Sequence, residues 1–333
     1  MIRQVWPSAG CARPVVPHDP LPHEMVERVL LSPDLSGAIF SQLCDTVDPG
    51  AAVAFSSASS ELWALTHAQR QQLKADYNAA AALFRKLGMQ SWKELREAKT
   101  VEVEGRIGLS DDNLATLGKL GSLLPALDNL GISIYPLRLN ERAAGPDGVP
   151  RLAEKLGAGA LPALTFVSLY NMHVGDAGAS ALAAALDRGA LPRLAHLRLT
   201  NAAIGDAGVV ALVPALRRLP TLRTLCLSGN HLLGDEGAAA LVAPPPPPPA
   251  GAPPTAAGAL TALTTVWLND TQITDTGCAT LAAAIRSGAL PALHDLYLWR
   301  GTLASAASRT AVFEALVSLR GPSPFDHFGL YHF

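Results

Sequence analysis

The sequence contains few aromatic residues, and its charges are nearly balanced. Aromatic side chains make up 5% of the 333 residues, so a large core must be built mainly from Leu, Val and Ala. The formal net charge is -2, with 26 basic and 28 acidic residues. This balance provides neither the basic field that nucleic acid attracts nor an acidic tail for a cationic partner. We therefore expect no nucleic-acid partner.

Cysteine is also scarce, and the motifs of common enzymes are absent. The four cysteines (Cys11, Cys44, Cys226 and Cys278) are far apart and form no C-x-x-C pair, which argues against a disulfide framework and a zinc site. The nine histidines are scattered. The sequence has no G-x-x-x-x-G-K-[ST], G-x-G-x-x-G, G-x-S-x-G or H-E-x-x-H motif. We expect no catalytic residue, no metal and no cofactor.

Long apolar runs are missing as well. No run reaches the roughly 18 residues that a membrane helix needs. The first residues, "MIRQVWPSAGCARPVVPHDPLPHE", contain no continuous apolar segment of the secretory type. We therefore expect a protein of the cytoplasm or nucleus, with reduced cysteines and no membrane partner.

What the sequence does contain is a repeated phrase. "IGDAGVVAL" at 204–212 has counterparts in "VGDAGASAL" at 174–182 and "LGDEGAAAL" at 233–241. Ahead of each phrase lies a pair of apolar residues separated by one position. Some of these apolar pairs are not followed by the glycine-containing phrase. When they are included, the first members of the pairs fall at 101, 137, 167, 197, 225, 266 and 296. Seven units with a period near 30 indicate a repeat architecture.

Each unit predicts a strand, a turn and a helix. The alternating apolar pair is typical of a half-buried strand. The aspartates of the phrase lie where a helix begins, so we expect each to cap its own helix through its carboxylate. They are Asp176, Asp206, Asp235 and Asp275. The recurring "GALP" at Gly159, Gly189 and Gly288 predicts left-handed glycines that end the helices.

This order of elements resembles the leucine-rich repeat, in particular the long helical type of ribonuclease-inhibitor-like proteins. The resemblance covers roughly residues 99–320 and implies an α/β horseshoe solenoid with parallel strands inside and helices outside. Repeats of this family usually have Asn or Cys three residues after the second apolar residue of the strand. Here that position holds Met172, Ala202, Asn230, Thr271 and Gly301. Only Asn230 matches, so we expect turns that form with a depleted polar ladder.

Two spacings exceed the period. The first is assigned to a longer loop at 129–136, ahead of a strand that begins at Leu137. The second contains the Pro-rich insert 243–255, which predicts an extended polyproline segment. This insert is either a ligand for a WW-type or profilin-type partner or a low-complexity surface loop. Residues 321–333 are expected to form a C-terminal cap.

The N-terminal hundred residues differ from the repeats. Residues 1–22 are Pro-rich and predicted to be disordered, and residues 23–98 predict a helical module. One helix is expected through 51–65 and another through 66–88. The order of Pro33, "IFSQL" and a later Trp63 resembles an F-box. That resemblance implies an adaptor-binding stripe of Leu35, Ile39, Phe40 and Leu43. The alternative is a helical cap that closes the end of the solenoid.

Alternate strand positions should line the concave face of the sheet. They include Arg138 and Asn140 on an early strand and an aromatic group on the last two strands, which is the usual composition of a binding hot spot. The predicted partner-binding residues are Trp267, Tyr297, Trp299, Asn269, Asp295, Arg198, Tyr170 and Phe166. If residues 321–333 instead cover the aromatic group, the binding surface shifts to Arg138, Tyr170 and Arg198.

These observations favour a non-catalytic protein–protein interaction module. If the N-terminal module is an F-box, the resemblance implies a substrate receptor of a cullin-type ubiquitin ligase, with the adaptor on the module and the target on the concave face. One alternative is a leucine-rich-repeat scaffold or sensing protein without a ligase role. Another is a GTPase activator, because one such family uses a ribonuclease-inhibitor-like solenoid. That family has an acidic C-terminal tail, whereas this sequence ends in "FGLYHF".

Overall fold

The computed structural model describes residues 32–43, 45, 48–89, 91–104, 109–133, 145–244, 260–298 and 300–321. The chain divides into two compact units between Leu95 and Arg96. Several predicted features lie outside the described residues. They are residues 1–22, which were predicted to be disordered, nearly all of the Pro-rich insert and of the predicted C-terminal cap, and the residues Leu137, Arg138, Asn140 and Trp299.

The N-terminal unit is helical. Its core contains Phe40 and Ala52, both fully buried, together with Leu73 and the partly buried Phe55. The rings of Tyr77 and Phe84 lie 5.6 Å and 4.9 Å from the ring of Trp92. The helices of this part of the chain are α2 (Pro33–Leu43), α3 (Gly50–Ser56), α4 (Ser60–Leu65), α5 (His67–Lys86) and α6 (Trp92–Glu97).

The single helix predicted through 51–65 is wrong, because the structure divides it into α3 and α4. Serines make the break. The hydroxyl of Ser57 donates to the carbonyl of Val53 at 2.8 Å, and the side chain of Ser59 accepts from the backbone N–H of Leu62 at 3.1 Å. Ser59 therefore acts as the N-cap of α4. Serine favours such local hydrogen bonds over a continuous helix.

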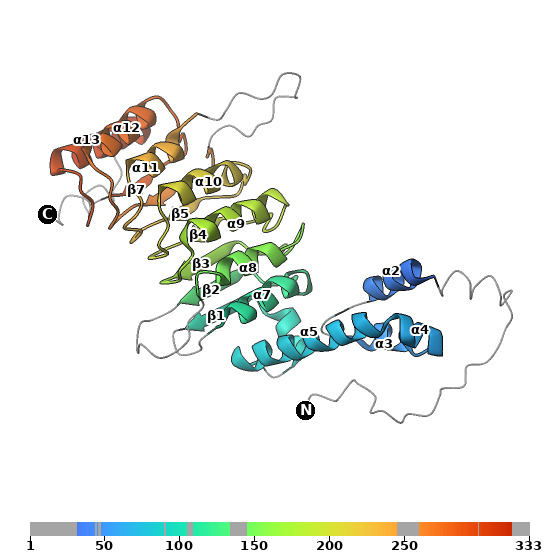
Figure 1. The fold of residues 1–333 in the computed structure, drawn as a ribbon. Helices are drawn as coiled ribbons and strands as arrows, with labels where there is room; N and C mark the ends of the chain where they lie inside the picture. Colours follow the sequence, from blue (N-terminus) through green and yellow to red (C-terminus); the bar gives the residue numbers. More distant parts are fainter. Residues whose placement is uncertain are drawn as a thin grey trace, which may run out of the picture. The chain divides into compact units, whose positions relative to one another are not determined.

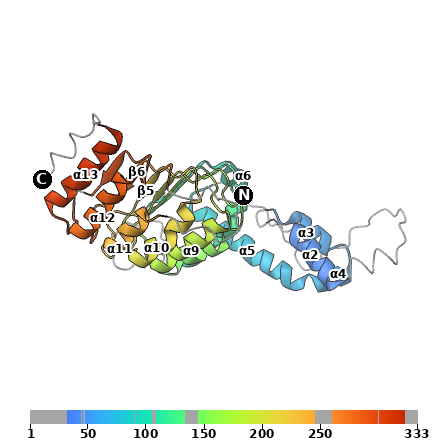
Figure 2. The same ribbon diagram turned by 90° about the horizontal axis from the view of Figure 1, so that it is seen from above.

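The second unit is a repeat solenoid built on one parallel sheet. Seven strands pair in sequence order, β1 to β7, and each is followed by its helix (Figure 1). In the turned view the later helices form a row alongside the strands (Figure 2). The strands are β1 (Thr100–Glu104), β2 (Asn129–Ser133), β3 (Phe166–Tyr170), β4 (His196–Arg198), β5 (Thr224–Cys226), β6 (Thr265–Trp267) and β7 (Asp295–Tyr297). The helices are α7 (Asp111–Lys119), α8 (Gly148–Lys155), α9 (Gly175–Asp187), α10 (Asp206–Leu216), α11 (Asp235–Val242), α12 (Asp275–Arg286) and α13 (Ala306–Arg320), with the 3-10 turn η1 (Leu120–Leu123).

The core lies between the sheet and the helices. Leu197, Leu225 and Val266 occupy equivalent positions on adjacent strands and are at most 3% exposed. Leu182 and Leu186, four residues apart on α9, are buried as well. Strand alternation and helical spacing thus place apolar side chains of both kinds of element between the sheet and the helices. This arrangement confirms the predicted α/β solenoid.

The second strand lies earlier than the sequence predicted. β2 is Asn129–Ser133, and Leu130 pairs with Val101 on one side and Val167 on the other. The loop placed at 129–136 is therefore wrong at residues 129–133, and the second strand of the sheet is not the one predicted to begin at Leu137, which lies outside the described residues. Leu130 and Ile132 form an alternating pair 29 residues after Val101, so the extra residues of this repeat follow the strand instead of preceding it.

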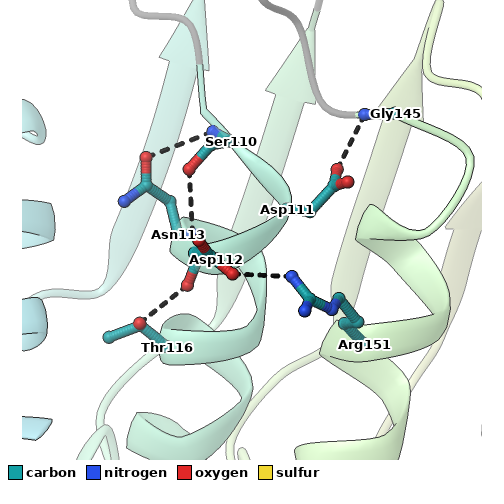
Figure 3. Close-up of polar contacts among 7 residues, drawn as sticks. All are labelled: Ser110, Asp111, Asp112, Asn113, Thr116, Gly145 and Arg151. Carbon is teal, nitrogen blue, oxygen red and sulfur yellow. Dashed lines mark hydrogen bonds and ion pairs between the residues drawn. The ribbon is translucent and has the colours of Figure 1, made fainter.

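The aspartates of the repeated phrase do not cap their own helices, contrary to the sequence prediction. Each carboxylate instead accepts a backbone N–H from the following repeat, at the start of the next helix. Figure 3 shows the same kind of contact in an earlier repeat that lacks the phrase, where Asp111 Oδ1 accepts from Gly145 N at 2.7 Å while the neighbouring Asp112 pairs with Arg151. The acceptor and donor pairs are Asp111 with Gly145, Asp176 with Gly205 and Gly208, Asp206 with Gly234 and Gly237, Asp235 with Thr274, and Asp275 with Ser305. We call this set the carboxylate ladder.

The second glycine of the phrase makes room for the ladder. A Cβ at Gly208 would lie 2.5 Å from Asp176 Oδ1 and 2.8 Å from a methyl carbon of Ile204. At Gly277 it would lie 2.3 Å from Asp235 Oδ1. The glycine is therefore required by the aspartate of the preceding repeat. The "GALP" glycines behave as predicted, since Gly159, Gly189 and Gly288 all have positive φ.

Asn230 is the one residue of the internal polar ladder that satisfies four backbone groups. It is fully buried. Its Oδ1 accepts from the N–H groups of Ala202 and Ile204, both at 3.0 Å, and its Nδ2 donates to the carbonyls of Leu199 and Leu227. In the next repeat Thr271 makes a single bond, to the carbonyl of Leu268. The predicted depletion of this ladder is thus visible in the structure.

Candidate functional site

The open face of the sheet is formed by the strand side chains that alternate with the buried ones. Strand register arranges them in rows across the sheet. The central row contains Ser168, Arg198, Cys226, Trp267 and Tyr297. A parallel row contains Phe166, His196, Thr224, Thr265 and Asp295. Because neighbouring strands lie about 4.8 Å apart, side chains in one row contact each other directly.

Trp267 and Tyr297 form the aromatic end of the central row. Their rings are stacked, with centroids 3.8 Å apart and an interplanar angle of 15°. Both side chains remain partly exposed. Burial, followed by the negative charge of Asp295, raises the pKa of Tyr297 above its ordinary value, so the hydroxyl stays protonated near neutral pH. The stack therefore offers one flat apolar surface with a hydrogen-bonding group at its edge.

A second group lies on β3 and β4. The guanidinium of Arg198 lies over the ring of Phe166, 5.6 Å from its centroid. His196 lies beside Phe166, and its Nδ1 is 3.0 Å from the hydroxyl of Thr224. Burial lowers the pKa of His196, and the positive charges of Arg198 and Arg223 lower it further. The imidazole is therefore neutral at neutral pH and contributes hydrogen bonding instead of charge.

A hollow of about 500 Å³ lies between these two groups. Its position follows from the small side chain of Cys226, which is 7% exposed and stands between Arg198 and Trp267 in the central row. The thiol lies 3.3 Å from the hydroxyl of Thr200. The hollow is lined by Ser168, Tyr170, Arg198, Thr200, Cys226, Ser228, Trp267, Asn269, Asp270 and Arg300.

The structure brings together part of the predicted binding set. Tyr170, Arg198, Trp267 and Asn269 line the hollow, and Tyr297 extends it through the aromatic stack. Phe166 and Asp295 lie in the parallel row, and Trp299 lies outside the described residues.

Sequence reasoning missed Thr200, Ser228, Asp270 and Arg300, which line the hollow. All four lie beyond the last residue of a strand, where the period-two alternation no longer predicts which way a side chain points. The available signal was their position one or two residues past Arg198, Cys226, Asn269 and Trp299.

The predicted adaptor-binding residues have different surroundings. Phe40 is fully buried in the core of the N-terminal unit, and Ile39 is partly exposed on α2. The side chains of Leu35 and Leu43 lie outside the described part of the structure. Nearby, Trp63 is 40% exposed, with the guanidinium of Arg70 over its ring at 3.2 Å.

The described residues contain no group of three or more His, Cys, Asp or Glu side chains that could hold a metal ion. Among the helices of the described segments, none combines the length and the apolar character that crossing a membrane requires. Two of the four cysteines lie in these segments, and both Cys226 and Cys278 are free and buried. Burial, with the charges of Asp275 and Asp235, raises the pKa of Cys278 to about 11.

Comparison with known proteins identifies the repeat. The family model described as Leucine Rich repeat matches residues 193–213 and 218–242. These two stretches contain β4 with most of α10, and β5 with α11, and they hold Asn230 and the third pair of the carboxylate ladder. No curated protein matches the chain. The family matches and the seven-stranded parallel sheet together show a leucine-rich-repeat solenoid.

Proposed function

We propose that this leucine-rich-repeat solenoid binds a protein partner on its open face, at the hollow bordered by Trp267. Leucine-rich repeats generally act as non-catalytic interaction scaffolds. The observation that carries the proposal is the stack of Trp267 on Tyr297 beside the hollow, on neighbouring strands of the parallel sheet. Partly exposed aromatic side chains at the edge of a depression are the usual anchors of protein interfaces. The solenoid supplies the geometry, and no step of chemistry is required of it.

Site-specific photo-crosslinking tests this proposal. Benzoylphenylalanine replaces Tyr170, an aromatic side chain that lines the hollow, or Val210, a 43% exposed residue on α10 that serves as the control position. In extract of the native cells, the probe at 170 should capture a defined protein and the probe at 210 should not. Trp267→Ala should remove that product while lowering stability by only about 1 kcal/mol, the value of one aromatic stack. Capture that is equal at both positions, or unaffected by Trp267→Ala, would contradict the proposal.

We also propose that the repeats are of the ribonuclease-inhibitor-like type. A period near 30 residues and full helices such as α9, with 13 residues, support the ribonuclease-inhibitor-like type of leucine-rich repeat. Such repeats leave the strand side chains of the open face available to a partner.

A role as substrate receptor of a cullin-type ligase is the second candidate. It is favoured by a separate compact helical unit ahead of the repeats and by the partly exposed Ile39 on α2. In the full-length protein, Ile39→Ala combined with Leu43→Ala should abolish binding to the ligase adaptor at micromolar concentration. Ala38→Ser, at an exposed position of the same helix, should leave it intact. A folded wild-type protein that does not retain the adaptor would leave the N-terminal unit as a capping module.

A further inference from the structure

The hollow on the open face has an uncompensated positive charge. Arg198 and Arg300 both line it and are both exposed. Within the described part of the chain, no carboxylate forms an ion pair with either guanidinium. This contrasts with Arg151 and Arg218, which pair with Asp112 and Asp187 at 2.6 Å. Arg198 and Arg300 are therefore available to an anionic group of a partner.

The charged residues that line the hollow favour a partner group with a single negative charge. Asp270 is the one carboxylate that lines the hollow with the two arginines. Two guanidinium groups and one carboxylate leave one positive charge to be matched. A carboxylate neutralises it, whereas the phosphate group of a phosphorylated residue carries about two negative charges and would face Asp270 in excess.

Hydroxyl groups complete the polar lining. Ser168, Thr200 and Ser228 all border the hollow. The Oγ of Ser228 is buried and has no hydrogen-bond partner among the described residues. Rotation to another staggered conformer turns this hydroxyl without any backbone movement. It can then donate to an acceptor oxygen in the hollow.

The apolar and the charged parts of the site are separated by a fixed distance. Arg198 lies on β4 and Trp267 on β6, two strand spacings apart in the same row, or about 10 Å. An extended peptide covers this distance with about three residues. The site thus has the dimensions of a short linear segment that crosses the strands.

We propose that the hollow binds an unmodified acidic segment of a protein partner. One Asp or Glu carboxylate accepts hydrogen bonds from Arg198 and Arg300, and an apolar residue about three positions away packs on the Trp267–Tyr297 stack. This inference rests on the proposed function, because it names the chemistry of the partner at the same site.

A random 12-residue peptide library displayed on phage, selected on the full-length protein, tests the proposal. Selected peptides should be enriched in Asp or Glu two to four residues from an aromatic or aliphatic residue. The double variant Arg198→Gln, Arg300→Gln should lose this acidic enrichment and bind the best peptide at least tenfold more weakly. The matched variant Arg193→Gln, Arg286→Gln, altered at exposed arginines that do not line the hollow, should select and bind as the wild type does.

The best peptide then separates the alternatives. Replacing its acidic residue by the neutral amide should weaken binding at least tenfold, and replacing it by phosphoserine should not strengthen binding. Stronger binding of the phosphoserine peptide would overturn the choice of a carboxylate. Binders that depend on Trp267 but contain no enriched acid would overturn the inference and leave the proposed function standing. A selection in which no binder depends on Trp267 would overturn both.

Discussion

Asp176 Oδ1 lies 3.0 Å from the backbone nitrogen of Gly208, and the two residues belong to neighbouring repeats. The same oxygen accepts from Gly205 N at 2.7 Å. The carboxylate fills the space that a Cβ at position 208 would need. In the repeated phrase the aspartate therefore serves the following repeat, and the second glycine receives the aspartate of the preceding repeat at Gly208, Gly237 and Gly277.

Substitution of either partner should destabilise the solenoid. Gly208→Ala forces a methyl group against Asp176 and Ile204, and overpacking of this kind costs about 2 kcal/mol. Asp176→Ala leaves two partly buried N–H groups without their charged acceptor and should also cost about 2 kcal/mol. Gly157→Ala is the matched control, because a methyl group there would have no atom within 4 Å, and it should be nearly neutral. Urea unfolding of each variant measures these differences.

A double-mutant cycle tests whether the two residues act together. With Asp176 shortened to Ala, the oxygen that opposes the new methyl group at 208 is gone. The free energy lost by the double variant should therefore be smaller than the sum of the two single losses by 0.5 kcal/mol or more, roughly the lower limit for residues in contact. Simple additivity would show that the glycine is required for another reason.

Asn230 should be among the least replaceable residues of the solenoid. Asn230→Leu leaves two N–H groups and two carbonyls of the turn without a partner in a fully buried position, which should cost about 3 kcal/mol or more. Thr271→Val removes one hydrogen bond at the equivalent position and should cost about 1 kcal/mol. Equal losses in urea unfolding would mean that the four bonds of Asn230 are replaced by water.

The stability of the solenoid should depend on pH through His196. Burial and the charges of Arg198 and Arg223 lower the pKa of His196 in the folded protein, so the unfolded chain binds a proton more readily. The free energy of unfolding should therefore fall as pH drops below about 6.5, the ordinary histidine value, and level off below the folded pKa. His196→Gln should remove this component of the pH dependence.

The contribution of Arg198 to that shift can be measured directly. NMR titration of the His196 Cε1–H signal, assigned by its absence in His196→Gln, should show a higher pKa in Arg198→Gln than in the wild type. Arg193→Gln is the control and should leave the pKa unchanged. A pKa that is the same in all three proteins would show that the charge of Arg198 does not contribute to the shift.

Cys278 should resist thiol reagents while the protein is folded. The residue is fully buried, and its pKa is raised to about 11, so almost no thiolate is present at pH 8. Mass spectrometry after treatment with iodoacetamide should find Cys278 unmodified in the native protein and fully modified in urea. Rapid modification without urea would indicate local opening between α12 and α13.

The sequence predicted the architecture because two periodicities agree. Alternating apolar residues define strands such as β4, and apolar residues four apart define helix faces such as that of Leu182 and Leu186. The prediction failed at β2 because the extra residues of that repeat were placed ahead of the strand, at 129–136, whereas they follow it. A fixed offset cannot show on which side of a strand an insertion lies.

The details of the site could not be predicted for a different reason. The donor that each aspartate serves lies in the next repeat, and local sequence patterns contain no information on that contact. The hollow exists because Cys226 is small and stands between two large side chains of neighbouring strands. Its depth depends on three repeats at once. Trp267 and Tyr297 were found from alternation alone, but their stacking required the register of β6 with β7.

The carboxylate ladder gives the solenoid a direction. Every acceptor precedes its donors in the chain, from Asp111 with Gly145 to Asp275 with Ser305. During synthesis from the N-terminus, each new helix start therefore emerges when the oxygen that will bind it is already in place. Shortening the chain by a repeat at its C-terminal end leaves an aspartate free to be hydrated by water. Removing a repeat at the other end replaces a charged acceptor by water at the backbone N–H groups of the next helix start, so the two ends of the array are not equivalent.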